Sequence, residues 1–288
     1  MPQDVDRWRR AGRIGGAARS LGTGLIRVGA SRRDVAEEIE RYIRSQGALP
    51  AFPANLSIND EAAHFTPDPE DDRRFRTGDV VKVDVGAHID GAISDTAATV
   101  EVGSTRYTAL LSATSSAVEA ASKELKGGVE TNVLSRTIER SIHALGFKPV
   151  ENLTGHTIET YLLHAGKSVP NVTGMANARL EPGEVVAIEP FATNGVGRIG
   201  NGPFGNIMRF REEPDRERFP ELSELYGRFR TLPFCARWVS EPELRTALQR
   251  SRKRLQTYPV FVEEGQGWVS QAERTFLVVD GGCEVLTP

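Results

Sequence analysis

The sequence predicts an α+β fold built from two similar halves, and three observations support this prediction. Two helical segments followed by strands occur twice along the 288 residues. Two runs of alternating apolar residues flank Asp90-Gly91, which is typical of a β-hairpin. A charged segment of helical character, residues 198–257, separates the last two groups of strands and indicates an insertion. No residue-level repeat relates the halves, so the two-fold pattern rests on the order of the elements.

The first half begins with two predicted helices. Residues 4–28 predict a helix that is broken by glycines. In the next helix, Ser31 is the expected N-cap and Gly47 the expected stop. The apolar side chains of this helix fall on one face: Val35, Ile39 and Ile43. A proline-rich turn, a short strand and a polar loop then lead into the hairpin strands VVKVDVG and AISDTAATVEV.

The second half repeats this order. Two helices are predicted in TRYTALLSATSSAVEAASKELKGG and ETNVLSRTIERSIHALGF, and Gly146 ends the second. Strands are predicted in KPVENLTGH and GEVVAIEPFAT. A last hairpin is predicted in YPVFVEEGQGWVSQAERTFLVV. The second half therefore resembles the first in design, apart from the insertion.

Composition and charge point to a soluble globular protein. The formal net charge is −3 and the isoelectric point is about 6.0, which gives no electrostatic reason to expect nucleic acid or an anionic membrane as a partner. Cys235 and Cys283 are far apart and form neither a disulfide framework nor a zinc motif. The N-terminus lacks the apolar region of a secretory signal, and no run is long enough to span a bilayer. We expect a cytoplasmic protein.

The hairpin carries an aspartate in each strand, Asp84 and Asp95, although strand interiors disfavour this residue. If the turn centres on Ile89-Asp90, the two aspartates lie opposite each other; if it centres on Asp90-Gly91, they are offset by two residues. Both registers place them on one face. Neighbouring carboxylates repel unless a cation lies between them. The alternative is a pair of solvent-facing aspartates on a half-exposed hairpin.

Three more polar side chains lie in or beside predicted strands: His156 in NLTGHTIE, Glu189 in AIEPFAT and Glu273 in WVSQAERTFLVV. Buried acids are uncommon in sheets unless they are paired or bind a metal. Each residue alone could be structural, as a satisfied core histidine or an edge-strand glutamate. Together with the two aspartates, they suit two divalent first-row metals, whose charge the four carboxylates would balance.

Four motifs together resemble the methionine aminopeptidases, in the pita-bread metallopeptidase family: KVDVGAHIDGAISDTA, NLTGHTIETYLLHAGKSVPNV, AIEPFATNGVG and QAERTFLV. The resemblance covers nearly the whole chain, and the motifs occur in the family's order. It implies a pita-bread fold in which two pseudo-symmetric α/β halves surround a curved antiparallel sheet, as one catalytic domain over 1–288. The insertion at 198–257 resembles that of type 2 enzymes, and the lack of an N-terminal extension resembles archaeal members.

The resemblance also implies roles for seven residues. Asp84 would chelate one of two divalent ions (Co, Mn, Fe or Zn), Asp95 and Glu273 would bridge both, and His156 and Glu189 would bind the other. Glu189 would also shuttle protons. His64 in NDEAAHFTP and His164 in YLLHAGKS match the two histidines that flank the substrate in this family.

The activity implied is removal of the N-terminal methionine from nascent proteins when the second residue is small, through a hydroxide held by two metals. The expected partners are peptides and nascent chains with an N-terminal methionine, and a monomer is expected. One alternative is a proline dipeptidase or aminopeptidase P, although such enzymes usually carry an extra N-terminal domain. Another is a non-catalytic relative that binds nucleic acid or proteins, for which lost ligands and a basic face would be expected.

A few residues fall outside the motif pattern. His143, within an amphipathic helix, is expected to be structural, and His88, near the hairpin turn, is expected to be solvated. Thr157, Thr160 and Arg274 differ from the residues that the family commonly has at these positions. These departures bear on fine specificity or rate, since none of the three is a predicted ligand.

Overall fold

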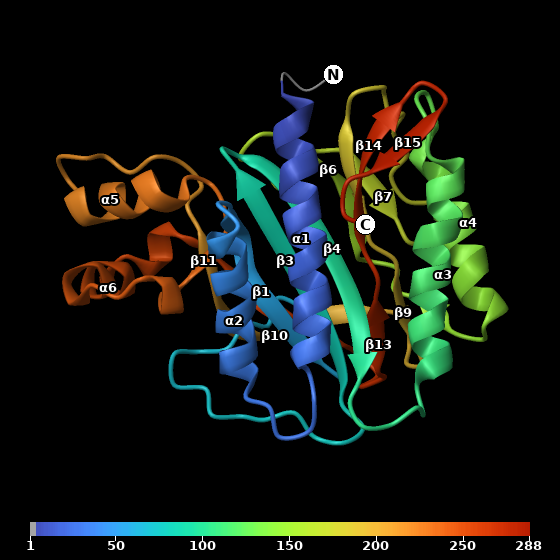
Figure 1. Cartoon of the computed structure of the whole chain (residues 1–288), viewed down its shortest axis with the longest axis horizontal. Helices are drawn as coiled ribbons and strands as arrows, with labels where there is room; N and C mark the ends of the chain where they lie inside the picture. The colour runs from blue at the N-terminus through green and yellow to red at the C-terminus, as the bar shows by residue number, and fades with distance from the viewer. Residues whose placement is uncertain (1–3) are drawn as a thin grey trace.

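The computed structural model of the protein describes residues 4–288 and contains two halves of similar design (Figure 1). The N-terminal half comprises α1 (Val5–Leu25), α2 (Arg32–Ser45), β1 (Leu49–Ile58), β2 (Glu61–Ala63), β3 (Val80–Ile89) and β4 (Ala92–Glu101). The C-terminal half begins with α3 (Thr108–Glu124), α4 (Thr131–Ala144), β5 (Lys148–Pro149), β6 (Thr154–Ile158), β7 (Ser168–Pro170), β8 (Val185–Ile188) and β9 (Phe191–Thr193). It continues with β10 (Ile199–Arg209), β12 (Gln256–Glu263), β13 (Val269–Gln271), β14 (Arg274–Val279) and β15 (Gly282–Val285). The predicted α+β order of two helices followed by strands, occurring twice, is confirmed.

The strands of the two halves meet at a seam. One sheet has the order β1-β3-β4, and the largest sheet has the order β15-β14-β8-β6-β7. Ala97 in β4 and Glu273, between β13 and β14, exchange backbone hydrogen bonds in both directions, at 3.3 and 2.9 Å. This antiparallel bridge joins the halves at the middle of the molecule.

Helices cover the strands of each half. α1 packs on β3 and β4, α2 packs on β1, and α3 and α4 pack on each other (Figure 1). One apolar core lies between α1, α2 and the first sheet, and a second lies among α3, α4, β8 and β14. Each half therefore has its own core. The sheet faces that are turned away from the helices are available to form a site.

The glycines of residues 4–28 do not break the first helix, which corrects the sequence prediction. α1 is continuous, and they allow it to approach its neighbours closely. A Cβ atom on Gly12 would lie 2.1 Å from the carbonyl oxygen of Leu286, and one on Gly15 would lie 2.4 Å from Ser94 Oγ. Each glycine costs about 1 kcal/mol in helix propensity, but the close packing of α1 outweighs that preference.

The second helix follows the prediction. Ser31 Oγ accepts a hydrogen bond from Asp34 N at 3.2 Å and caps α2. Gly47 follows the helix at a φ of 73°, in the left-handed region that glycine adopts without strain. Its N–H donates to Arg44 O at 3.1 Å, so both predicted ends of this helix are confirmed.

The segment predicted as an insertion begins and ends in strands that pair with each other, β10 and β12. Between them lie α5 (Pro220–Phe229), β11 (Phe234–Cys235), the 3₁₀ turns Ala236–Trp238 and Arg252–Arg254, and α6 (Pro242–Arg250). These elements share their own apolar cluster, which includes Leu225, Phe234 and Val239. In Figure 1 they form a lobe on the side of the molecule away from α3 and α4. That this lobe marks a type 2 enzyme remains a prediction.

No helix within residues 4–288 has both the length and the apolar character needed to cross a membrane.

Candidate metal centre and active site

The hairpin of β3 and β4 places its two aspartates on one face. The turn is Asp90-Gly91, and both residues have the positive φ, 48° and 84°, that a tight hairpin turn requires. Asp84 lies opposite Ala97, and Asp95 lies opposite Gly86. The aspartates are therefore offset by two residues, as in the second of the two predicted registers.

The C-terminal half brings three further side chains to the seam. His156 lies within β6, Glu189 directly follows β8, and Glu273 lies between β13 and β14. β6 and β14 lie on either side of β8 in the same sheet, so the three residues lie in or next to neighbouring strands. The bridge between Glu273 and Ala97 then brings this sheet against β4, which carries Asp95.

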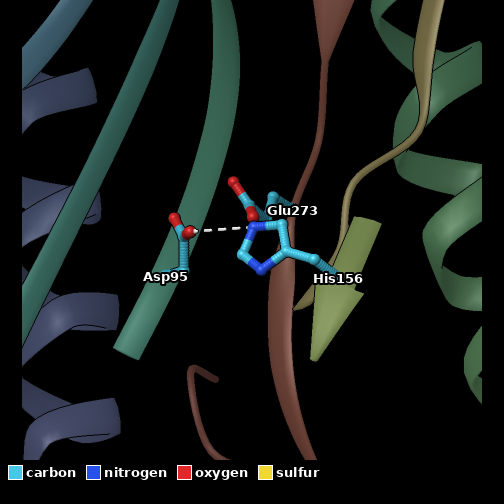
Figure 2. Close-up of side chains that lie close together, drawn as sticks. All are labelled: Asp95, His156 and Glu273. Atoms are coloured by element: carbon cyan, nitrogen blue, oxygen red, sulfur yellow. Dashed lines mark ion pairs between the residues drawn. The ribbon is translucent and has the colours of Figure 1, made fainter. Parts of the chain in front are cut away.

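Three of these residues form a tight group. Ligand atoms of Asp95, His156 and Glu273 all lie within 4.8 Å of one another. Figure 2 shows the Asp95 and Glu273 carboxylates directed toward the His156 ring from neighbouring segments. His156 Nε2 lies 3.6 Å from Asp95 Oδ2 and 3.5 Å from Glu189 Oε1. Asp84 and Glu189 line one cavity together with these three residues. We call the four carboxylates of Asp84, Asp95, Glu189 and Glu273 the acid cluster.

Burial raises the pKa of every member of the acid cluster. It raises the pKa of Asp84 to about 7. For Asp95, Glu189 and Glu273, burial and then the neighbouring carboxylates hold the pKa well above its usual value. Burial also lowers the pKa of His156 to about 3, so its imidazole is neutral. The four charges are therefore unfavourable together unless a cation joins them.

Several buried oxygens of the acid cluster have no hydrogen-bond partner among residues 4–288: Asp84 Oδ1, Asp95 Oδ1 and Glu273 Oε1. Gln271 Nε2 donates to Glu273 Oε2 at 3.3 Å, but the other oxygen of that glutamate is left without a donor. Buried acceptors without donors are costly. Divalent first-row metals prefer carboxylate oxygens and neutral imidazole nitrogens as ligands. The unpartnered oxygens beside His156 therefore fit a metal site.

A cavity of about 220 Å³ adjoins the acid cluster, and all seven predicted site residues line it: His64, Asp84, Asp95, His156, His164, Glu189 and Glu273. His64 follows β2 at a φ of 66°, which is uncommon for a residue with a side chain. Its ring lies 4.5 Å from that of Phe261 and 5.2 Å from that of Tyr258, between centroids. The His164 ring lies 4.3 Å from that of His156. Burial lowers the pKa of His64 and of His164 to about 4, so both imidazoles are neutral.

The apolar wall of the cavity was not predicted from the sequence. It includes Phe52, Leu163, Ile207, Tyr258 and Phe261, which come from four separate segments. Their side chains are ordinary for strands, so no local pattern distinguishes them. Gln271 is different: it stands two residues before Glu273, and the two-residue period of a strand could have placed it beside that glutamate.

The prediction that His88 is solvated is wrong. His88 is buried, and its Nδ1 accepts a hydrogen bond from Gly91 N at 3.3 Å. The loop containing Tyr161 covers this end of the hairpin, because Tyr161 N donates to Gly91 O and its ring packs against the imidazole. Burial lowers the pKa of His88 to about 4. A contact across 70 residues of sequence could not be read from the hairpin itself.

The other exceptional residues have structural contacts. His143 is exposed near the end of α4, with Nδ1 3.1 Å from Phe147 O. Thr157 Oγ1 accepts from Lys167 N at 3.3 Å, and Thr160 is exposed. Arg274 Nη1 donates to Glu273 O at 2.9 Å and so supports the backbone beside the acid cluster.

Comparison with known proteins identifies the class. The metallopeptidase family M24 matches residues 6–212, which contain all of the acid cluster except Glu273. The chain belongs to this family.

Relatives within the family narrow the comparison. A methionine aminopeptidase from Archaeoglobus fulgidus is 44% identical over 266 residues, which is 91% of each chain. The structure of a methionine aminopeptidase from Thermotoga maritima has a TM-score of 0.73 at 23% identity and covers 100% of this chain and 97% of that one. The structure of a thermophilic Arx1 has a TM-score of 0.84 at 16% identity, over 98% and 90%. At these identities the two structures establish the pita-bread fold alone.

Proposed function

We propose that this chain removes the N-terminal methionine from peptides and nascent proteins when the second residue is small. The observation that carries the proposal is the acid cluster with its unpartnered oxygens, which faces a cavity. It occurs in a chain that is 44% identical to a methionine aminopeptidase over 91% of its length. A cytoplasmic location and a monomeric state remain predictions of the sequence.

The acid cluster and His156 would hold two divalent ions, from among Co, Mn, Fe and Zn. Asp84 would chelate one ion, and His156 and Glu189 the other; Asp95 and Glu273 would bridge both. When bound, the ions would polarise the scissile carbonyl and lower the pKa of a water molecule.

Three side chains beside the cluster would handle protons and substrate. Glu189 would accept a proton and return it to the leaving amine, the role of a general base placed beside the reacting groups. His64 and His164 are neutral and can each donate one hydrogen bond. Directed at the carbonyl oxygen, such donors stabilise the charge that develops on it as the peptide bond is attacked.

The rest of the cavity suits the side chain of methionine. Aromatic and aliphatic groups of Phe52, Leu163, Tyr258 and Phe261 line it. An unbranched, polarisable thioether packs well against such an irregular apolar wall. The free amine of the substrate would lie at the acid cluster, which explains a requirement for a chain end.

The test is hydrolysis by chelator-treated protein to which each of the four metals is added in turn. We expect no activity without metal and release of methionine from Met-Ala-Ser after metal is restored. Ala-Pro dipeptides serve as the competing substrates. Cleavage of Ala-Pro with Met-Ala-Ser left intact would replace this proposal with a proline dipeptidase, and full activity of metal-free protein would reject the two-metal site.

A further inference from the structure

The cavity wall continues along β10 and β12 to a half-buried arginine, Arg209. Ile207 in β10 and Tyr258 in β12 are buried and line the cavity. Side chains two residues apart in a strand share a face. Arg209 and Gln256 therefore extend the same wall toward solvent, where both are half-buried. The two residues are paired across the strands, and Arg209 Nε donates to Gln256 Oε1 at 3.0 Å.

Arg209 also lies near His164, on the side of the cavity opposite the β10–β12 wall. The positive charge of its guanidinium acts on the His164 ring. The same charge opposes the rise that burial causes in the pKa of Tyr258. His164 lies in the loop after β6, and Tyr258 lies in β12, so the guanidinium is near both walls.

The guanidinium retains donors that no neighbour uses. Within residues 4–288, its hydrogen bond to Gln256 is the only one it makes, and no carboxylate lies within 4 Å. Arg228 in α5 is different, because its two Nη atoms donate hydrogen bonds to Glu241 and Glu224. An arginine held by a neutral amide, with both Nη groups available, presents a planar fork that fits a carboxylate.

We infer that Arg209 binds a carboxylate of the substrate downstream of the small second residue, so that the enzyme favours peptides with acidic residues after that position. This inference rests on the proposed function. Residues beyond the scissile bond would leave the cavity between His164 and the β10–β12 wall, where the guanidinium of Arg209 has N–H groups without a partner among residues 4–288. The carboxylate can come from an Asp or Glu side chain or from the C-terminus of a short peptide.

The experiment compares kcat/KM for Met-Ala-Asp-Asp-amide and Met-Ala-Lys-Lys-amide with the metal-loaded enzyme. We expect the acidic peptide to be favoured about fivefold, the upper range for a partly exposed ion pair. The preference should shrink in 1 M salt, because salt screens partly exposed charges. Arg209→Gln should abolish it, and Arg209→Glu should reverse it. A second pair, Met-Ala-Ser-Ser with a free or an amidated C-terminus, measures recognition of the terminal carboxylate separately.

The matched control is Arg216→Glu, which makes the same charge change at an exposed position of the insertion. It should keep the ratio of the wild-type enzyme. Equal rates for both peptides in the wild type, or an unchanged ratio in Arg209→Glu with its metals bound, would overturn the inference. Hydrolysis of Met-Ala-Ser separates the two levels: if this neutral peptide is cut while charge has no effect, only the role of Arg209 fails. If it is not cut, the proposed function fails first.

Discussion

Two parts of the molecule bury carboxylates, and they do so in opposite ways. Glu40 in α2 contacts the lobe that contains α5 and α6, and both of its oxygens accept hydrogen bonds there. Arg237 Nη1 and Nη2 donate to the two oxygens at 2.9 Å each, and both side chains are at most 3% exposed. Trp238 Nε1 adds a bond at 2.7 Å, and Ala54 N adds one at 3.2 Å. A buried carboxylate with this many donors has a structural role, and we call this contact between the lobe and the main body the joint.

The acid cluster has four carboxylates and almost no donors. Gln271 provides one hydrogen bond, and three of the buried oxygens have no partner within the part of the chain described. Burial alone therefore does not identify a functional acid, because Glu40 is as buried as the acid cluster. What distinguishes the acid cluster from Glu40 is that no lysine or arginine among residues 4–288 forms an ion pair with its oxygens, and a metal ion would satisfy these acceptors.

The largest expected effect comes from Glu273→Ala. Its predicted role is to bridge both ions, so its loss removes ligand charge from each of them and leaves Asp84 and Asp95 repelling. We expect metal content and activity to be lost together, as measured by elemental analysis and by kcat/KM on Met-Ala-Ser. His64→Ala is the matched control in the same cavity. It should keep its metals and lose about 10²–10³ in rate, as for removal of an oxyanion donor. Retention of both ions by Glu273→Ala, or their loss from His64→Ala, would contradict these assignments.

Glu40→Ala should cost about 3–5 kcal/mol in the free energy of unfolding, because it leaves Arg237 buried without its partner. Urea denaturation at pH 7.5 measures this. Glu119→Ala is the control, since Glu119 forms an exposed ion pair with Lys123 on α3 and should change stability by about 1 kcal/mol or less. Equal losses in both variants would mean that the joint between lobe and body contributes nothing particular.

Asp95→Asn should have the opposite sign in metal-free protein. Folding the apo form requires Asp95 either to bury its charge or to take up a proton, and the amide removes that requirement. We expect a gain in the free energy of unfolding at pH 8, together with loss of metal binding. Asp90→Asn, at the exposed turn of the same hairpin, should leave both properties nearly unchanged. If Asp95→Asn destabilises the apo protein as Glu40→Ala does, the two regions are alike after all.

The sequence was most informative where the physical signal is local. The period of two in the β3–β4 hairpin placed Asp84 and Asp95 on one face in either register, and the structure then selected the register with the turn at Asp90-Gly91. Ser31 and Gly47 likewise marked the ends of α2. These features depend on neighbours within a few residues, so they could be read directly from the chain.

Features that depend on distant segments could not be predicted in this way. The glycines of α1 look like helix breakers until Leu286 and Ser94 are seen to pack against them. The lining by Phe52, Ile207 and Tyr258 arises only when three strands converge. The partnership of Glu40 and Arg237 spans 197 positions. His88 belongs to the same group, because its cover comes from the loop at Tyr161.

His88 provides the smallest predicted effect and a third kind of buried titratable group, one that is satisfied while neutral. Its Nδ1 accepts the Gly91 N–H, and a proton there would remove that bond. Burial lowers its pKa from 6.5 to about 4, with Asp90 acting weakly in the other direction. The unfolded chain therefore binds more protons than the folded one between these values. The stabilisation is complete above pH 6.5 and is lost as the pH falls toward 4. Between pH 7.5 and 5 it should amount to about 2 kcal/mol in the free energy of unfolding.

The acid cluster contributes a pH dependence of opposite sign, but it does so equally in wild type and in His88→Gln. The difference between their urea denaturation curves at the two pH values therefore isolates the histidine. We expect the variant to lose about 2 kcal/mol less than the wild type on acidification; equal losses would mean that His88 is already hydrated in solution, as the sequence alone had suggested.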